Sequence, residues 1–228
     1  MNVAIIAAGG RGTRMGDSGG GRAKQYREIS GIPLIIHTLR RFEQCATIDE
    51  LIVAAPVEDN GEVRALLAKH GLRKASRVVA GGTTRTESVR RALHAVDATT
   101  AVIVAVHDAA RPFVTSEEID RTVQEAAATG AAVLVAPVID TIKEVSEGRV
   151  VRTLERSRLR GAQTPQCFRF ELLWRAYEQA LAENVEATDD SALVERLGAL
   201  VSIVEGGAHN IKITTPQDFA LAEILLKV

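Results

Sequence analysis

The sequence predicts a doubly wound α/β protein built on a mostly parallel, Rossmann-like sheet. Apolar runs rich in Val and Ile alternate along the chain with segments of helical pattern. The apolar runs show no alternation between polar and apolar residues, which is typical of strands buried on both faces. Strands that alternate with helices predict a parallel sheet covered by helices on both sides. With 228 residues, 46% of them apolar, we expect one domain over residues 1–228.

The elements follow one another in strand–helix order. Strands are expected at residues 3–8, 50–55, 76–80, 101–106, 131–138 and 200–204. Helices are expected at residues 34–42, 59–70, 86–96, 116–129, 170–183 and 216–226. The clearest helix starts are Thr115-Ser116 before two glutamates and Thr215-Pro216, since Ser, Thr and an early Pro favour helix N-termini. In such sheets ligands bind at the carboxyl ends of the strands.

Residues 139–163 depart from this alternation. Two short β-like runs flank the turn-like Glu147-Gly148 and predict a hairpin. The segment is too long for a strand–helix loop and too short for a domain. It fits either an arm that contacts a second subunit or a plain surface excursion.

Charge and apolar patterning exclude several classes of protein. Lys and Arg number 28 against 29 acidic residues, a net charge of −1, so we expect no general nucleic-acid binding. The first apolar run lacks a basic start and is too short for a signal peptide. No apolar run approaches the roughly 18 residues of a membrane span. Cys45 and Cys167 have no metal-ligand spacing, so we expect reduced thiols in a cytoplasmic protein.

A glycine-rich loop follows the first strand and leads to cationic residues. Gly9, Gly10 and Gly12 would let backbone N–H groups approach a ligand, and Arg14 and Lys24 add positive charge. The pattern is neither a P-loop nor a dinucleotide fingerprint. A polyphosphate ligand is therefore our first hypothesis, and an ordinary tight turn is the alternative.

A second cluster follows the strand at residues 76–80. Gly81, Gly82, Arg85 and Ser88 open the next helix, and a helix N-terminus with glycines suits an anion or the polar edge of a base. An ordinary capped turn explains the same residues.

A third cluster ends the strand at residues 101–106. Asp108 can coordinate Mg²⁺ between phosphates and Arg111 can pair with a phosphate. The alternative is a buried Asp108–Arg111 ion pair, and we interpret His107 as structural. Arg156 and Lys212, taken singly, are equally compatible with exposed surface positions.

Together the motifs resemble a known family. AAG, GTRM, KQY, GGTTRTESV, HDAARP, DTIK, TPQ, TDD and NIKIT occur in order over nearly the whole chain, as in 2-C-methyl-D-erythritol 4-phosphate cytidylyltransferases of the non-mevalonate isoprenoid pathway. The resemblance implies a nucleotidyltransferase fold and transfer of a cytidylyl group from CTP to a sugar-alcohol phosphate, with release of diphosphate. It also implies a Mg²⁺ cofactor and a homodimer formed through the arm at residues 139–163.

The resemblance also implies a role for individual residues. Arg14 and Lys24 match the pair that stabilises charge on the CTP α-phosphate, while Arg156, lent by the partner subunit, and Lys212 match the cations that position the substrate phosphate. The implied nucleotide contacts are Ala7, Ala8, Gly9, Gly10, Gly12, Gly81, Gly82, Arg85, Ser88 and Ala109. The implied substrate contacts are Asp108, Arg111, Thr141, Arg156, Thr188 and Lys212, with Asp108 also near Mg²⁺.

Two departures from the family pattern concern loop length. The glycine loop is one residue longer than usual before Arg14, and the insert at residues 16–22 is also longer. Arg11 or Arg22 could therefore take the place of Arg14.

The reaction itself needs no general base, because the attacking oxygen would belong to an already anionic phosphate; it needs cations that bring two anions together. A ribitol 5-phosphate cytidylyltransferase, a sugar-phosphate nucleotidyltransferase using UTP or GTP, and a non-catalytic nucleotide-binding module remain alternatives. The missing dinucleotide fingerprint disfavours an NAD-dependent dehydrogenase.

Overall fold

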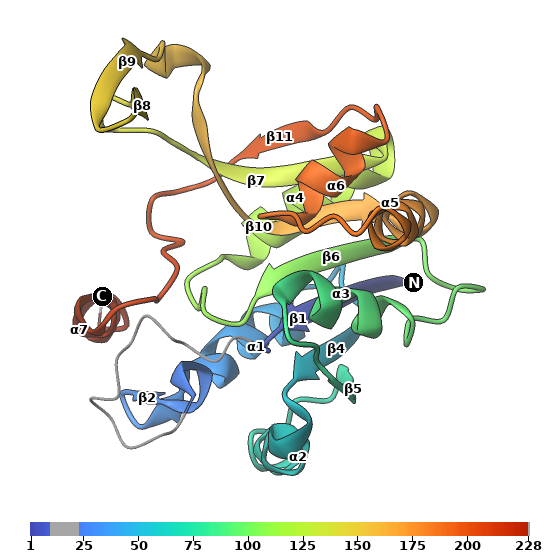
Figure 1. Cartoon of the computed structure of the whole chain (residues 1–228). Coiled ribbons are helices and arrows are strands. Elements are labelled where there is room, and N and C mark those ends of the chain that lie inside the picture. The colour runs from blue at the N-terminus through green and yellow to red at the C-terminus, as the bar shows by residue number, and fades with distance from the viewer. Residues whose placement is uncertain (10–22, 228) are drawn as a thin grey trace.

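A seven-stranded sheet runs through the centre of the molecule (Figure 1). The structure, a computed structural model, describes residues 1–9 and 23–227. The strands lie in the order β11-β7-β10-β6-β1-β4-β5. Their bounds are β1 Asn2–Ala7, β4 Glu50–Ala55, β5 Ala75–Ala80, β6 Ile103–Asp108, β7 Ala131–Pro137, β10 Arg160–Arg169 and β11 Ser202–Glu205. All six strands expected from the sequence are present, with ends shifted by up to two residues.

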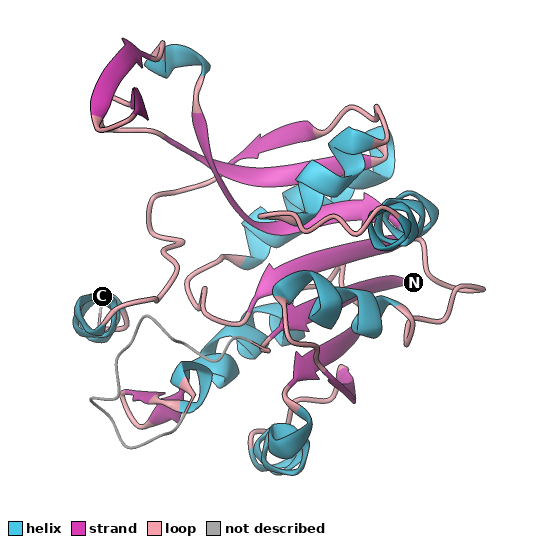
Figure 2. Ribbon diagram, in the orientation of Figure 1, coloured by secondary structure: helices cyan, strands magenta, loops and turns pink. Residues whose placement is uncertain are grey.

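Helices cover both faces of the sheet (Figure 2). Their bounds are α1 Leu34–Gln44, α2 Asn60–Lys69, α3 Arg85–Leu93, α4 Ser116–Thr129, α5 Phe170–Ala182, α6 Asp190–Arg196 and α7 Pro216–Leu225. Buried side chains of α1, α2 and α4 share one core cluster, and those of α3, α5 and α6 share the other. The doubly wound α/β fold is therefore confirmed, and α6 is a helix that the sequence pattern missed.

The central strand β1 shows why the apolar runs lack alternation. Val3 and Ile5 pack into the cluster beneath α3 and α5, while Ala4 and Ile6 pack into the cluster beneath α1 and α4. All four are at most 2% exposed. Both faces of the strand are covered, so apolar residues are favoured at every position.

Strand β10 is the main departure from the expected topology. It lies antiparallel between β6 and β7, whereas the other described strands of the sheet run in one common direction. Its residues are polar around Pro165, and the register with β7 shifts between Ala162 and Gln166. A proline in a central strand is tolerated at such an irregularity, which explains why the apolar pattern did not reveal this strand.

The predicted hairpin is present and projects away from the sheet (Figure 1). It consists of β8 (Lys143–Ser146) and β9 (Arg149–Thr153), followed by the 3-10 helix η4 (Arg156–Arg158). Glu147 and Gly148 both have positive φ, 50° and 74°, which is the backbone of a two-residue hairpin turn. The expected segment at residues 139–163 includes residues 160–163, which belong to β10 of the central sheet. We call residues 139–159 the arm.

Short elements complete the chain. The 3-10 helix η2 (Lys24–Tyr26) is followed by a small ribbon of β2 (Glu28–Ile29) and β3 (Ile32–Pro33), and η3 (Val57–Asp59) precedes α2. Within residues 1–9 and 23–227, no helix is long and apolar enough to cross a membrane.

Candidate active site

The candidate site lies where the strand order changes direction. From β1 the chain adds β4 and β5 on one side and then returns to add β6 on the other side. The register of β1 and β6 places Ala7 opposite Asp108, at the carboxyl ends of both strands. A crevice forms at such a point in an open α/β sheet, and ligands bind there. The fold therefore brings the end of β1, from which the glycine loop continues, beside Asp108.

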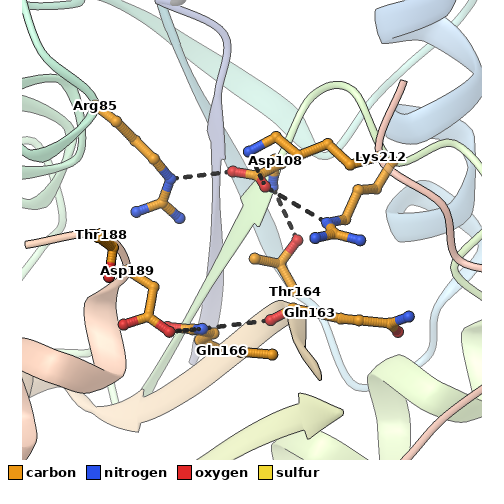
Figure 3. Close-up of a pocket in the computed structure, with 10 residues that line it drawn as sticks. Arg85, Asp108, Gln163, Thr164, Gln166, Thr188, Asp189 and Lys212 are labelled. Atoms are coloured by element: carbon orange, nitrogen blue, oxygen red, sulfur yellow. Dashed lines mark hydrogen bonds and ion pairs between the residues drawn. The ribbon is translucent and has the colours of Figure 1, made fainter. Parts of the chain in front are cut away.

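Asp108 stands at the centre of a cluster of cations (Figure 3). Its Oδ1 accepts from Arg85 Nε at 3.0 Å, and its Oδ2 lies 2.8 Å from Lys212 Nζ and 3.5 Å from Arg111 Nε. Burial by itself would raise the pKa of Asp108, but the charges of Arg85 and Lys212 outweigh burial and hold that pKa far below its usual range. The expected Asp108–Arg111 pair exists, but it is the longest of three contacts.

Arg85 joins Asp108 to a second, fully buried carboxylate. Its two terminal nitrogens bind both oxygens of Asp190, at 3.0 and 2.7 Å. The hydroxyl of Tyr177 also donates to Asp190. Burial would lower the pKa of Arg85, yet the two aspartates raise it well above its usual value. Three of the five N–H donors of Arg85 are thus used within the chain, and its side chain orients Asp108. Arg85 also lines the pocket described below, and its contact with the nucleotide stays a prediction.

A buried chain of hydrogen bonds holds Asp108 from behind. The Asp108 N–H donates to Thr164 Oγ1 at 3.1 Å, and that hydroxyl lies 3.0 Å from His107 Nδ1. His107 Nε2 lies 3.1 Å from the Arg111 carbonyl, which can only accept, so Nε2 carries the ring proton and Nδ1 accepts from Thr164. Burial lowers the pKa of His107 to about 4. The ring is neutral at pH 7, which agrees with its predicted structural role.

A pocket of about 240 Å³ opens beside this cluster. It is lined by Arg85, Asp108, Arg111, Ala162, Gln163, Thr164, Gln166, Thr188, Asp189 and Lys212 (Figure 3). The volume is below the range usual for drug-sized ligands and suits one phosphorylated small molecule. Asp108, Arg111, Thr188 and Lys212, four of the expected substrate contacts, therefore share one pocket.

Gly9, after β1, and Gly81 and Gly82, after β5, come together around Ser88. A Cβ atom on Gly9 would lie 2.6 Å from Ser88 Oγ, and one on Gly81 would lie 3.1 Å from the same oxygen. Ser88 Oγ accepts from the Gly82 N–H at 3.0 Å and donates to the Thr84 carbonyl at 2.8 Å. Larger side chains would close this space. Four expected nucleotide contacts, Gly9, Gly81, Gly82 and Ser88, thus form one cluster, with Thr84 capping α3.

Lys24 is tied to the same region from the other side. Its Nζ donates to the Ile213 carbonyl at 3.0 Å, one residue beyond Lys212. The neighbouring Gln25 donates to the Ala8 carbonyl at 2.8 Å, and the Ala7 carbonyl accepts from the Ala109 N–H at 3.1 Å. These backbone bonds fix the end of β1 beside Ala109. Ala7, Ala8 and Ala109 therefore lie together, as a shared nucleotide contact requires.

Some predicted residues lie elsewhere. Thr141 and Arg156 are exposed residues of the arm and do not line the pocket; Arg156 Nη1 donates to the Ile139 carbonyl at 2.6 Å. Gly10, Gly12 and Arg14, together with the competing Arg11 and Arg22, lie outside the described residues.

The sequence interpretation missed several residues that organise the pocket. Asp190, Gln166 and Asn210 belong to the motifs TDD, TPQ and NIKIT, from which only Thr188 and Lys212 were assigned. Gln166 accepts from the N–H groups of Asp190 and Ser191 and so binds β10 to α6. Reading the whole motifs would have found these three; Tyr177 gave no signal in the sequence.

The described residues offer little for a metal ion by themselves. No group of three or more His, Cys, Asp or Glu residues gathers within residues 1–9 and 23–227 in a way that could hold one. Asp108 is the predicted ligand, and both its oxygens face cationic donors. A metal at this site would need most of its ligands from phosphates and water.

Fold and site together define an α/β enzyme of the nucleotidyltransferase class, with a glycine cluster beside a cation-lined pocket at the switch point of the sheet. The chain belongs to the family IspD: 2-C-methyl-D-erythritol 4-phosphate cytidylyltransferase, whose family model matches residues 2–228. It is similar to proteins of that name from Syntrophus aciditrophicus, with 44% identity over 99% of this chain and 95% of the relative, and from Symbiobacterium thermophilum, with 46% identity over 98% and 92%.

Solved structures agree with this membership. The 4-diphosphocytidyl-2C-methyl-D-erythritol synthase from Anaerococcus prevotii superimposes with a TM-score of 0.87 at 30% identity, over 100% of this chain and 99% of that one. The 2-C-methyl-D-erythritol 4-phosphate cytidylyltransferase from Thermus thermophilus gives 0.77 at 35% identity, over 99% and 98%.

Proposed function

We propose that this chain transfers the cytidylyl group of CTP to 2-C-methyl-D-erythritol 4-phosphate at the pocket beside Asp108, as a step of isoprenoid precursor synthesis. An oxygen of the substrate phosphate attacks the α-phosphorus of CTP and forms a new P–O bond. The bond from that phosphorus to the bridging oxygen breaks, and diphosphate leaves. The products are 4-diphosphocytidyl-2-C-methyl-D-erythritol and diphosphate.

One observation carries this proposal above all. Lys24, Arg111 and Lys212 are held around a single backbone segment at the carboxyl ends of β1 and β6. Two anionic substrates repel each other, so a site for their union must supply positive charge to both. The attacking phosphate is already anionic at pH 7, and no proton has to be removed from it. The described residues that line the pocket include cations and neither Ser nor Cys, and such a lining fits this chemistry.

The roles of the cations follow from where they lie. We assign Lys24 to the α-phosphate of CTP, and Lys212 with Arg111 to the phosphate of the sugar alcohol. Arg14, which lies outside the described residues, is assigned to the α-phosphate from the family resemblance alone. Thr188 would contact the hydroxyl groups of the same substrate. Removing a donor aimed at charge that grows in the transition state costs about 10²–10³ in kcat in comparable enzymes.

The cytosine base is assigned to the cluster of Gly9, Gly81, Gly82 and Ser88, beside the backbone of Ala7, Ala8 and Ala109. Backbone groups there would pair with the amine and ring edge that distinguish cytosine from uracil. A site built to hydrogen-bond one base discriminates strongly, because the wrong base leaves buried polar groups unpaired.

Mg²⁺ is part of the proposal as a companion of the triphosphate. Phosphate oxygens and water would supply most of its ligands, and Asp108 is the carboxylate placed to share it. When bound, the ion would neutralise charge on the phosphates. The protein's own contribution is to orient Asp108 through Arg85 and Thr164.

The arm supports a homodimer in which each subunit completes the site of the other. Ile139, Val145, Val150 and Val151 are between 58% and 74% exposed along the arm. Apolar groups gathered on one projecting element favour contact with a second protein surface. A twofold dimer would exchange the two arms symmetrically, and Thr141 and Arg156 would then reach the partner's pocket. The two buried free thiols fit a reducing, cytoplasmic location.

The test is release of diphosphate by the purified chain. We expect turnover with CTP and 2-C-methyl-D-erythritol 4-phosphate in the presence of Mg²⁺, and kcat/KM for UTP lower by at least about 10²-fold. Ribitol 5-phosphate serves as the matched alternative acceptor. A higher kcat/KM for ribitol 5-phosphate would change the substrate assignment, and comparable values for CTP and UTP would contradict the base assignment.

A further inference from the structure

The segment at residues 206–213, which links β11 to α7, gathers the cations of the pocket without forming a helix or a strand. It carries Lys212 itself. Its Ile213 carbonyl accepts from Lys24 at 3.0 Å, and its Asn210 carbonyl accepts from Arg111 Nη1 at 2.8 Å. The placement of three cations therefore depends on where this one stretch of backbone lies.

The Asn210 side chain fixes the middle of that segment. It is 0% exposed. Its Nδ2 donates to Gln163 Oε1 and to the Thr164 carbonyl, both at 3.0 Å and both on β10. Both hydrogens of the amide are thus used, and the two bonds reach a strand of the central sheet.

Thr164 of β10, one of the two partners of Asn210, also holds Asp108. Thr164 accepts from Asn210 through its carbonyl and from the Asp108 N–H through its hydroxyl. One residue therefore sets the distance between the carboxylate of β6 and the cations of the 206–213 segment. Other anchors of the segment are the bonds from the Gly206 N–H to the Val135 carbonyl and from the Ile213 N–H to the Ala110 carbonyl. Glu118 adds two more, because it accepts from the Gly207 N–H at 2.9 Å and lies 3.2 Å from His209 Nε2.

We infer that Asn210 is a positioning residue, which aligns Lys212, Arg111 and Lys24 with Asp108 by fastening residues 206–213 to β10. The inference rests on the proposed function, since it concerns the cations that act in that reaction. Asn210 itself touches no reacting atom. Its loss would move three charges together, and a displacement of about 1 Å at a reacting centre can cost about 10²-fold in rate.

The first experiment compares the parent chain with Asn210→Ala and Asn210→Asp in the diphosphate-release assay, with thermal unfolding of each. Asn210→Asp keeps the shape of the side chain but replaces its NH₂ donor with a carboxylate oxygen. That oxygen would face two other acceptors, Gln163 Oε1 and the Thr164 carbonyl. We expect kcat to fall on the order of 10²-fold in both variants while each remains folded at the assay temperature. Asn184→Asp, at an exposed site after α5, is the matched control and keeps parental kcat.

A double-mutant cycle separates positioning from a general loss of structure. If Asn210 acts through the cations, Asn210→Ala will cost about tenfold or less in a Lys212→Ala background, because the main charge that it aligns is already gone. A merely structural role predicts the same fold-change in both backgrounds. Gln163→Met is the second variant if Asn210→Ala does not fold. It removes one acceptor of the Asn210 amide and also the Gln163 Nε2 bond to the Gly207 carbonyl of the same segment, and we expect a loss of about tenfold in kcat.

The outcomes distinguish this inference from the proposed function. An active parent whose folded Asn210 variants stay within about threefold of its kcat overturns the role of Asn210 alone, as does a fully multiplicative cycle or an unchanged Gln163→Met. A parent that releases no diphosphate from CTP overturns the proposed function, and the inference with it.

Discussion

Charged side chains are buried in the pocket and exposed in the arm. In the pocket, Asp108 is 6% exposed and meets three cationic groups, and the Asp190 carboxylate behind it is fully buried. In the arm, the Arg152–Glu144 pair has side chains that are 68% and 47% exposed. Ion pairs in water contribute little, whereas buried ones hold a geometry that is costly to break. The pocket is thus organised within one chain.

The apolar side chains differ between the sheet and the arm in the same way. Apolar residues of the central strands β4 and β6 are buried on both faces, while Ile139, Val145, Val150 and Val151 of the arm are exposed. The comparison favours an arm that is covered by another surface, whereas the described residues of the pocket are already held together within one chain. Predictions that separate the two regions follow, from the largest expected effect to the smallest.

Lys24→Ala should cause the largest loss. We expect kcat to fall by about 10²–10³ with little change in KM for CTP, because the Lys24 charge is assigned to negative charge that grows in the transition state. Steady-state rates of diphosphate release measure both constants. Lys69→Ala, on the last turn of α2, is the matched control. A Lys24→Ala enzyme with normal kcat and a raised KM would make Lys24 a ground-state contact only.

Mixed dimers test whether the arm serves the partner's pocket. Arg156→Ala and Lys24→Ala subunits should each be nearly inactive alone. Random re-pairing at equal amounts makes about half of the dimers mixed, and each mixed dimer has one complete site of two, so about a quarter of parental activity should return.

The control for this experiment pairs two residues assigned to the same pocket. A mixture of Lys212→Ala with Lys24→Ala should recover nothing, because neither site of the mixed dimer is complete. If the Arg156→Ala mixture also stays inactive after verified subunit exchange, Arg156 acts within its own chain or not at all.

The pattern of apolar residues along the sequence predicted most of the strands and helices. The run at residues 50–55 and the capped helix at residues 116–129 match β4 and α4 at both ends, because burial on both faces and a capping box leave clear marks in a sequence. Strand β10 left none: its polar residues around Pro165 serve the pocket instead of the core. The polar residues that line the pocket therefore interrupt the apolar pattern by which the other strands were predicted.

The sequence predicted which motifs form the site, but it did not predict the contacts between their side chains. Asp108, Arg111 and Lys212 were expected near a ligand, and the structure brings them together. No spacing rule could show that Arg85 would be bound by Asp190, 105 residues further along the chain, or that Asn210 would hold β10. Such partners depend on tertiary packing, which a single sequence does not encode locally.

Asp190→Asn should destabilise the fold far more than the equivalent change in the arm. Removing one charge of the buried Arg85–Asp190 pair should lower the free energy of unfolding by about 3 kcal/mol. Glu144→Gln, which breaks the exposed Arg152–Glu144 pair, should cost about 0–1 kcal/mol. Urea unfolding of both variants and the parent gives the two differences. Equal costs would contradict the contrast between a buried network and a solvated one.

Glu118→Gln should destabilise the fold less than Asp190→Asn, and its effect should depend on pH. Glu118 is 4% exposed; its carboxylate accepts from the Thr115 N–H at 2.9 Å in the capping box of α4, and from the Gly207 N–H at 2.9 Å. Burial would raise the pKa of Glu118, but the bonds from Thr115 and Gly207 outweigh it and lower that pKa. In Gln, an amide NH₂ replaces one oxygen and faces a backbone donor, which should cost about 1–2 kcal/mol at pH 7.

The pH dependence follows from the sign of that shift. A carboxylate whose pKa is lowered by folding stabilises the native state above its unfolded pKa, and the contribution is lost as the pH falls through the folded value. The stability gap between parent and Glu118→Gln should therefore shrink as the pH falls below about 4.5. Glu155→Gln, on the exposed arm, should show no such gap at any pH. A Glu118→Gln gap that persists unchanged at pH 3 would mean that the hydrogen-bond acceptors of Glu118, and not its charge, hold α4 against Gly207.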